Sequence, residues 1–227
     1  MKFTFLLILT FFLFSHTTFA QVQEQLAFNR VYKYEHYDCE HPIGIILRDK
    51  IQFQNNADND YFMNIFNSEA EIVNVDLVKR QSFVSSNRFL KNEFLRANKI
   101  LMNELWVLDS VQAADFFALE ERFRFSEPKD TIIQDKTLKH FTIQANNPEA
   151  ETFKSFHLIV NTEMDSEQVV LNYPSFYFFL SRKGINLKGV LVEQYFINLD
   201  DQVYCHDILS AFEIINKRVV VNPFLKP

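Results

Sequence analysis

A histidine-rich turn and two cysteines are the residues of this sequence best suited to chemistry. The polar segment His36–His41 contains Cys39, and Cys205 is followed directly by His206 and Asp207. Imidazole, carboxylate and thiolate groups are the usual ligands of protein zinc, and they also act as general acids and bases. If the two segments meet in the fold, they supply enough such groups for a metal or acid–base site.

The first twenty residues have the order of a secretory signal peptide. Lys2 precedes an apolar run from Phe3 to Phe14, and Thr18 and Ala20 are the small residues expected before a cut at Gln21. The run is about 12 residues long, whereas a bilayer-spanning helix needs about 20. We therefore predict export to the periplasm or the extracellular space, with an uncleaved anchor as the alternative. The sequence has no Asn-x-Ser/Thr glycosylation site, which favours a bacterial source.

The two cysteines are expected to form a disulfide, because export brings them into an oxidising compartment. A bridge between Cys39 and Cys205 would hold the first and last strands of a sheet side by side. Two buried free thiols are the alternative. The bridge would also bring the His36–His41 turn towards His206 and Asp207.

The sequence lacks the motifs of several functional classes. The chain has only 3 glycines, too few for the loops that cradle nucleotide phosphates, and it contains no Gly-x-Ser-x-Gly, His-Glu-x-x-His or Cys-x-x-Cys motif. Its 23 basic and 29 acidic residues are interspersed and give a net charge of −6, which argues against binding to nucleic acid or to anionic lipid. No cofactor is expected, and catalysis is unsupported.

The elements that would position these residues begin with strands. Alternating apolar and polar residues predict strands over Arg30–Tyr37, Ile45–Asn55 and Tyr61–Asn67, with Ile51 and Phe53 facing inward. Val73, Val75 and Leu77 give the clearest alternation, in a fourth strand. The first third of the chain is therefore predicted to be a β-meander.

The period then changes to that of a helix. From Ser86 onward, apolar residues such as Leu90, Phe94 and Leu101 recur at three- and four-residue spacing, which predicts a helical insertion over residues 86–121 that packs on the sheet. The segment Leu105–Leu108 fits either the end of this helix or a short buried strand. Asp109 is a candidate cap for a second helix.

The second half returns to strands. The predicted elements are Arg122–Phe125, Leu138–Gln144, Phe153–Asn161, Val190–Asn198, Val203 onward and Val219–Val221, with Ser126–Lys136 as a loop. Phe176–Leu180 is apolar throughout and predicts a central strand, more suited to the core than to an aromatic ligand site.

These patterns together predict an α+β protein, mainly an antiparallel β-sheet (meander, open barrel or sandwich), with residues 21–227 as one domain. The favoured function is an exported, soluble binding or envelope-accessory protein without catalytic activity that holds a small apolar ligand or contacts an envelope protein. The alternative is a metal-assisted hydrolase that uses the His36–His41 turn together with His206.

Overall fold

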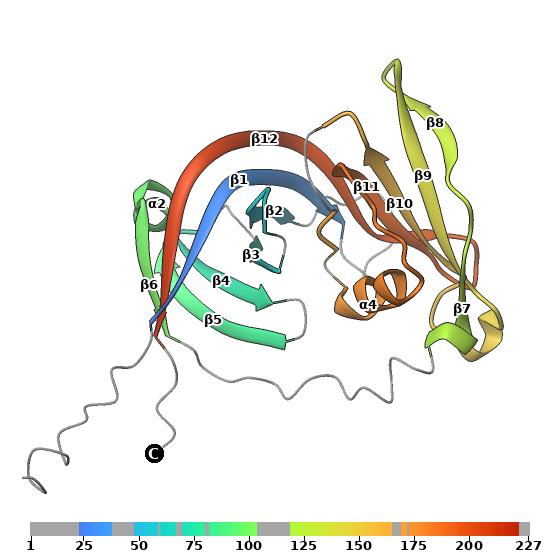
Figure 1. The fold of residues 1–227 in the computed structure, drawn as a ribbon, viewed down its shortest axis with the longest axis horizontal. Coiled ribbons are helices and arrows are strands. Elements are labelled where there is room, and N and C mark those ends of the chain that lie inside the picture. Colours follow the sequence, from blue (N-terminus) through green and yellow to red (C-terminus); the bar gives the residue numbers. More distant parts are fainter. Residues whose placement is uncertain are drawn as a thin grey trace, which may run out of the picture.

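The computed structural model describes residues 23–37, 48–58, 60–66, 70–79, 82–103, 119–164, 169–171 and 173–222. Their twelve strands form one open, mainly antiparallel sheet, as the sequence predicts (Figure 1). The strands are β1 (Glu24–Tyr37), β2 (Arg48–Gln54), β3 (Tyr61–Phe66), β4 (Ile72–Lys79), β5 (Ser82–Leu90), β6 (Lys99–Asn103), β7 (Phe123–Phe125), β8 (Lys129–Ile133), β9 (Lys136–Ala145), β10 (Ser155–Asn161), β11 (Val190–Ile197) and β12 (Val203–Asn222).

The predicted meander is confirmed, since β1 to β5 pair in sequence order and each pair is antiparallel. The sheet order is β5-β4-β3-β2-β1-β12-β11-β10-β9-β7, with β6 parallel to β12 and β8 paired to β9. β1 and β12 pair along most of their length and curve together as an arch over the molecule (Figure 1). The first and last strands are therefore neighbours at the middle of the sheet, with β2 to β5 on one side of the pair and β11, β10, β9 and β7 on the other.

In the described residues 86–103 of the predicted helical insertion, the helix is confined to six residues. Helix α2 (Lys91–Arg96) is a single segment between the strands β5 and β6. β6 forms because Ile100 and Met102 are buried while Leu101 between them is 58% exposed, an alternation that only a strand produces. The predictions for Leu105–Leu108 and Asp109 lie outside the described residues.

Two other predictions are wrong. The apolar segment Phe176–Leu180 belongs to helix α4 (Pro174–Arg182), in which Phe176, Phe179 and Leu180 are buried at helical spacing. Pro174 stands at its first turn, where a missing N–H costs nothing. The expected loop Ser126–Lys136 contains strand β8, which turns into β9 through Gln134 and Asp135, both with positive φ.

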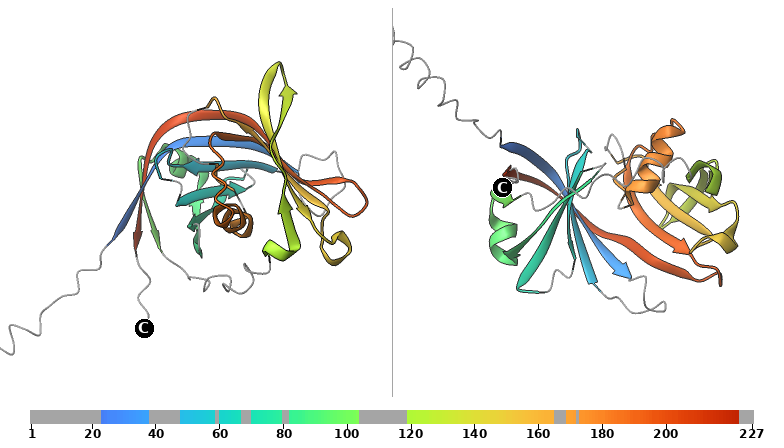
Figure 2. Two further views of the ribbon diagram at one scale, coloured as in Figure 1. Left: turned by 45° about the vertical axis from the view of Figure 1, so that its right-hand side comes forward. Right: turned by 90° about the horizontal axis from the view of Figure 1, so that it is seen from below.

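The sheet buries opposite faces in its two halves. An N-terminal core is formed by residues that include Leu26, Phe28, Val31, Ile51, Phe53, Met63, Phe94 and Val219. A C-terminal core includes Ile143, Phe156, Leu158, Phe176, Phe179 and Phe196. Helix α2 accompanies the first half and α4 the second (Figure 2, green and orange helices).

The change of face takes place at β1 and β12. On β11, Phe196 enters the C-terminal core, and Gln194, two residues earlier, lies on the same face. Gln194 donates a hydrogen bond to Asp207, which contacts His36 of β1. Val31 enters the N-terminal core from the opposite face of β1, because it is an odd number of residues from His36. The arch is therefore the seam between the two cores.

Phe94 is the anchor of α2, and its removal is expected to be costly. Its side chain is 2% exposed and packs against the rings of Phe53 and Phe89, with centroids 5.5 and 5.4 Å away. Phe94→Ala should lower the free energy of unfolding by about 3–5 kcal/mol in denaturant melts. Leu101→Ala, at an exposed position of the neighbouring strand β6, should change it by less than about 0.5 kcal/mol. Equal, small losses in both variants would show that α2 is not packed on the sheet.

Candidate binding pocket

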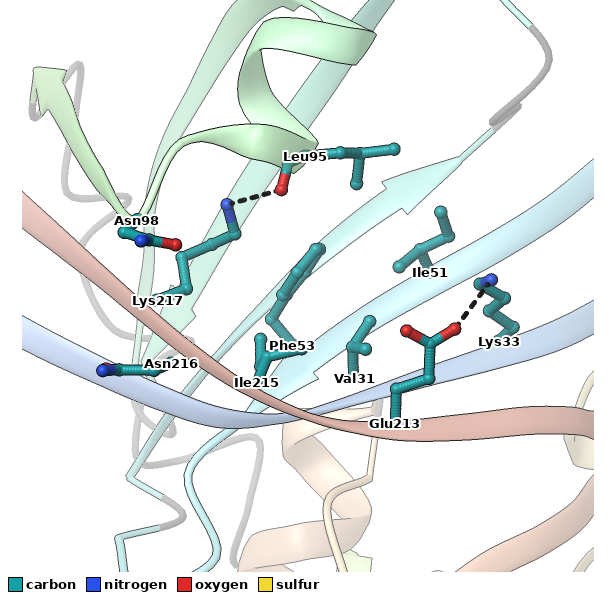
Figure 3. Close-up of a pocket in the computed structure, with 10 residues that line it drawn as sticks. All are labelled: Val31, Lys33, Ile51, Phe53, Leu95, Asn98, Glu213, Ile215, Asn216 and Lys217. Carbon is teal, nitrogen blue, oxygen red and sulfur yellow. Dashed lines mark hydrogen bonds and ion pairs between the residues drawn. The ribbon is translucent and has the colours of Figure 1, made fainter.

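A pocket of about 390 Å³ lies between helix α2 and the strands β1, β2 and β12 (Figure 3). Its lining residues are Val31, Lys33, Ile51, Phe53, Leu95, Asn98, Glu213, Ile215, Asn216 and Lys217. The volume falls within the range of small-molecule sites, about 300–1,000 Å³. The pocket lies on the face of the sheet that carries the N-terminal core.

The floor of the pocket is apolar. Val31, Ile51 and Phe53 come from adjacent strands and belong to the N-terminal core, and Ile215 packs against the same cluster from β12. Leu95 of α2 faces them across the pocket and is 40% exposed (Figure 3). Val31, Ile51 and Phe53 are only 2–6% exposed, so Leu95 and the partly buried Ile215 provide most of the apolar surface that a ligand could cover, at about 25 cal/mol per Å² removed from water.

Lys217 lies beside this floor as a buried cation. The side chain is 4% exposed, and its Nζ donates hydrogen bonds to the carbonyl oxygens of Phe94 (2.6 Å) and Ala97 (2.5 Å). These carbonyls stand at the end of α2, where helices leave acceptors without an internal partner. Burial lowers the pKa of Lys217 to about 8. Lys217 therefore fixes α2 over the pocket and adds a positive centre near its apolar wall.

The mouth of the pocket carries one ion pair. Lys33 Nζ of β1 lies 3.3 Å from Glu213 Oε1 of β12, and both side chains are about half exposed (Figure 3). Pairs this exposed contribute little to stability, roughly 0–1 kcal/mol. They are therefore free to exchange partners with a polar ligand group at small cost.

A second polar cluster, largely buried, lies on the other face of the same strands. Asp207 of β12 contacts Lys50 Nζ at 2.6 Å, His36 Nδ1 at 2.5 Å and Gln194 Nε2 at 2.5 Å. Lys50 and Asp207 are 1% and 3% exposed. The ammonium of Lys50 also lies 5.2 Å from the centre of the Tyr34 ring.

The charges in this cluster depend on one another. Burial alone raises the pKa of Asp207, but the positive charge of Lys50 and the hydrogen bond from His36 outweigh burial, so that the pKa lies well below its usual value. Burial lowers the pKa of Lys50, and Asp207 opposes that effect. The cluster links β1, β2, β11 and β12 through polar contacts at the seam between the two cores.

The histidines proposed for a metal site do not come together. His36 contacts Asp207, which shares a face with Gln194, whereas His206 contacts Glu193 at 2.7 Å. Gln194 and Glu193 are consecutive strand residues, so their side chains lie on opposite faces of the sheet. His36 and His206 are thus separated by the sheet itself. Asp38, Glu40 and His41 lie outside the described residues.

Cys205 is 5% exposed and belongs to the C-terminal core. Cys39 lies outside the described residues, so the disulfide remains a prediction. The register supports it, because Tyr37 at the end of β1 pairs with His206. Cys39 follows Tyr37 by two residues in the sequence, and Cys205 precedes His206 by one.

The residues missed by the sequence analysis had a weak signal. Glu213 and Lys217 of β12 are charged, which indicates a solvated surface, and the β-bulge between Ile214 and Lys217 interrupts the strand alternation there. Lys50 stands on the opposite face of β2 from the core residues Ile51 and Phe53, and a lysine at such a position also indicates solvent exposure. Neither pattern reveals that α2 lies over the first set of side chains or that Asp207 pairs with Lys50.

No family model and no curated protein matches this chain. Among solved structures, it is similar to MucB in complex with MucA(peri), at 7% identity and a TM-score of 0.42, over 84% of this chain and 51% of that one. The MucA/MucB complex of Pseudomonas aeruginosa gives 8% identity and a TM-score of 0.43, over 82% and 51%.

A putative outer membrane lipoprotein-sorting protein domain from Vibrio parahaemolyticus gives 9% identity and a TM-score of 0.25, over 84% of this chain and 85% of that one. The chain spans about half the length of the first two structures that it matches. All these TM-scores are below 0.5, and the likenesses are too distant to indicate a function.

Proposed function

We propose that this chain is an exported binding protein, at work in the cell envelope or outside the cell, that holds a small apolar or amphiphilic molecule in the pocket under α2. The observation that carries the proposal is the combination of an apolar floor (Val31, Ile51, Phe53) with a charged mouth (Lys33, Glu213) in a cavity of about 390 Å³. An apolar cavity with a few polar groups at fixed positions is the usual form of a small-molecule site.

The charged side chains of the pocket favour binding over catalysis. Lys33 and Glu213 pair with each other, and Lys217 donates to backbone carbonyls. A nucleophile or general base needs a lone pair directed at the substrate. Lys217 is engaged with backbone carbonyls, and the weakly held Lys33–Glu213 pair is suited to orienting the polar end of a ligand.

Export rests on the predicted signal peptide Met1–Ala20. Among the described residues, no helix is both long and apolar enough to span a bilayer. The interspersed charge and the excess of acidic residues support the absence of a nucleic-acid partner.

A pocket-filling substitution tests the proposal. Residues 21–227 are titrated with the neutral apolar dye N-phenyl-1-naphthylamine, excited beyond the absorption of tryptophan, and fluorescence enhancement reports binding. Ile215→Trp places a large ring in the pocket and should weaken binding at least about tenfold, the equivalent of about 1.4 kcal/mol. Displacement by medium-chain fatty acids and alcohols then shows whether a charged head group adds affinity.

Ile214→Trp is the matched control. Ile214 is the adjacent residue of β12 and is 75% exposed, and its strand neighbour Arg30 lies on the face opposite to Val31. The control should bind the dye as the unmodified protein does. Equal affinity of both variants, or the absence of saturable binding to the unmodified protein, would contradict the proposed function.

A further inference from the structure

The outer face of the second half of the sheet carries a row of imidazole and phenol rings. Phe156 and Phe196 point into the C-terminal core, so their strand neighbours His157 and Tyr195 point to the opposite face. His157 stacks on Tyr195 with ring centroids 4.7 Å apart. His140 of β9 lies on the other side of His157, with centroids 5.1 Å apart. The pocket and the buried cluster at Asp207 use none of these side chains.

His140 and His157 are in direct contact through their nitrogens. His140 Nε2 lies 2.8 Å from His157 Nδ1, so one N–H proton lies between the two rings. The remaining nitrogen of His157, Nε2, lies 2.7 Å from the hydroxyl of Ser155, which is 8% exposed. When His157 Nε2–H donates to this hydroxyl, its Nδ1 carries a lone pair. A hydrogen bond to the distal nitrogen is how proteins orient histidine ligands of metals.

Both rings are electrically suited to bind a cation at neutral pH. Burial, together with the nearby His140, lowers the pKa of His157 to about 4. Burial also lowers the pKa of His140, an effect that the negative charge of Glu193 opposes. Neutral imidazole is the form that binds metals. Ile159 of β10 is paired with Glu193 of β11 on one side and with His140 of β9 on the other. The Glu193 carboxylate therefore lies on the same face of the sheet as His140 and adds negative potential there.

We propose that His140 Nε2 and His157 Nδ1 together bind one divalent transition-metal ion, with Cu²⁺ as the favoured ion and water in the remaining positions. Metal–imidazole bonds are about 2.0–2.1 Å long. Two nitrogens 2.8 Å apart can therefore reach one ion from adjacent corners of a square, the geometry that Cu²⁺ prefers. Both rings need only turn so that their lone pairs converge, while the proton of His140 moves to its Nδ1.

The site is a two-histidine one. In the described part of the chain, no group of three or more His, Cys, Asp and Glu side chains is arranged to hold a metal ion. Among divalent ions, Cu²⁺ binds nitrogen ligands most tightly, so it is the ion for which two imidazoles give the most affinity. The site also differs from the one considered between His36 and His206.

The test uses residues 21–227 titrated with Cu²⁺ at pH 7. Isothermal calorimetry and electron paramagnetic resonance should show one saturable ion with hyperfine splitting from two nitrogens. His140→Gln and His157→Gln should each lower the affinity at least about tenfold, at the low end of the effect of altering a metal site, and should remove one nitrogen from the spectrum. Their far-UV circular dichroism should be unchanged, because both side chains are only half-buried.

His206→Gln is the control, since His206 lies on the same face but is bound to Glu193 at 2.7 Å. It should keep the two-nitrogen spectrum and bind Cu²⁺ at least as tightly, because the Glu193 carboxylate, which adds negative potential on this face, stays in place. If a glutamine variant unfolds, His140→Asn and His157→Asn provide the same comparison. The proposal is overturned if the unmodified protein binds no stoichiometric Cu²⁺, if either variant binds it as tightly as the unmodified protein, or if His206→Gln loses it equally.

Discussion

Lys50→Met should lower the free energy of unfolding by about 3–5 kcal/mol, as expected when one partner of a buried ion pair is removed. The substitution keeps the length of the side chain but leaves the carboxylate of Asp207, which is 3% exposed, without its positive partner. His36 and Gln194 still contact this carboxylate, so the variant should fold and remain measurable in denaturant. The measurement is the midpoint and slope of urea unfolding followed by circular dichroism.

Two further variants identify the cause of that loss. Replacing both partners, as in Lys50→Met with Asp207→Leu, removes the unpaired charge and should restore much of the stability. Lys33→Met removes the exposed partner of Glu213 and should cost less than about 1 kcal/mol. A loss for Lys50→Met as small as that for Lys33→Met would show that Lys50 and Asp207 do not hold the seam between the two cores.

Reduction of the protein should also destabilise it strongly, because we propose a disulfide between Cys39 and Cys205. In the chain-entropy model, closing a loop of this length stabilises the folded state by up to about 5 kcal/mol. Thiol titration of the unfolded, unreduced protein should detect no free cysteine. The Cys39→Ser, Cys205→Ser double variant should unfold at the same urea concentration as the reduced protein. Detection of two free thiols would rule the bridge out.

The strands were predictable because their pattern is local. Val73, Val75 and Leu77 are buried where alternation places them, and Ile51 and Phe53 are likewise buried. The helices were harder to predict. Leu90, Phe94 and Leu101 fit helical spacing, yet the chain leaves the helix after Arg96, because Ile100 pairs with Val219 of β12. That pairing partner is more than a hundred residues away, so the local sequence around Ile100 cannot predict the pairing.

The sites depend still more on distant contacts. A lysine that alternates with apolar residues usually faces solvent. Lys50 can be buried because Asp207 of β12 supplies a carboxylate partner for it. Similarly, the pocket requires α2, β1, β2 and β12 to meet. The pairing of β1 with β12 brings His36 and His206 near each other, as expected from a bridge between Cys39 and Cys205. The alternation of the strands nevertheless places the two histidines on opposite faces.

The most direct test of the binding pocket is a titration with N-phenyl-1-naphthylamine followed by NMR at the methyl groups of isoleucine, leucine and valine. If the dye enters the pocket, the signals of Val31, Ile51 and Ile215, which line it, should shift and saturate together. Those of Ile132 and Ile214, which are 73% and 75% exposed, should not move. Shifts confined to Ile132 and Ile214, or no shift at a saturating dye concentration, would contradict binding in this pocket.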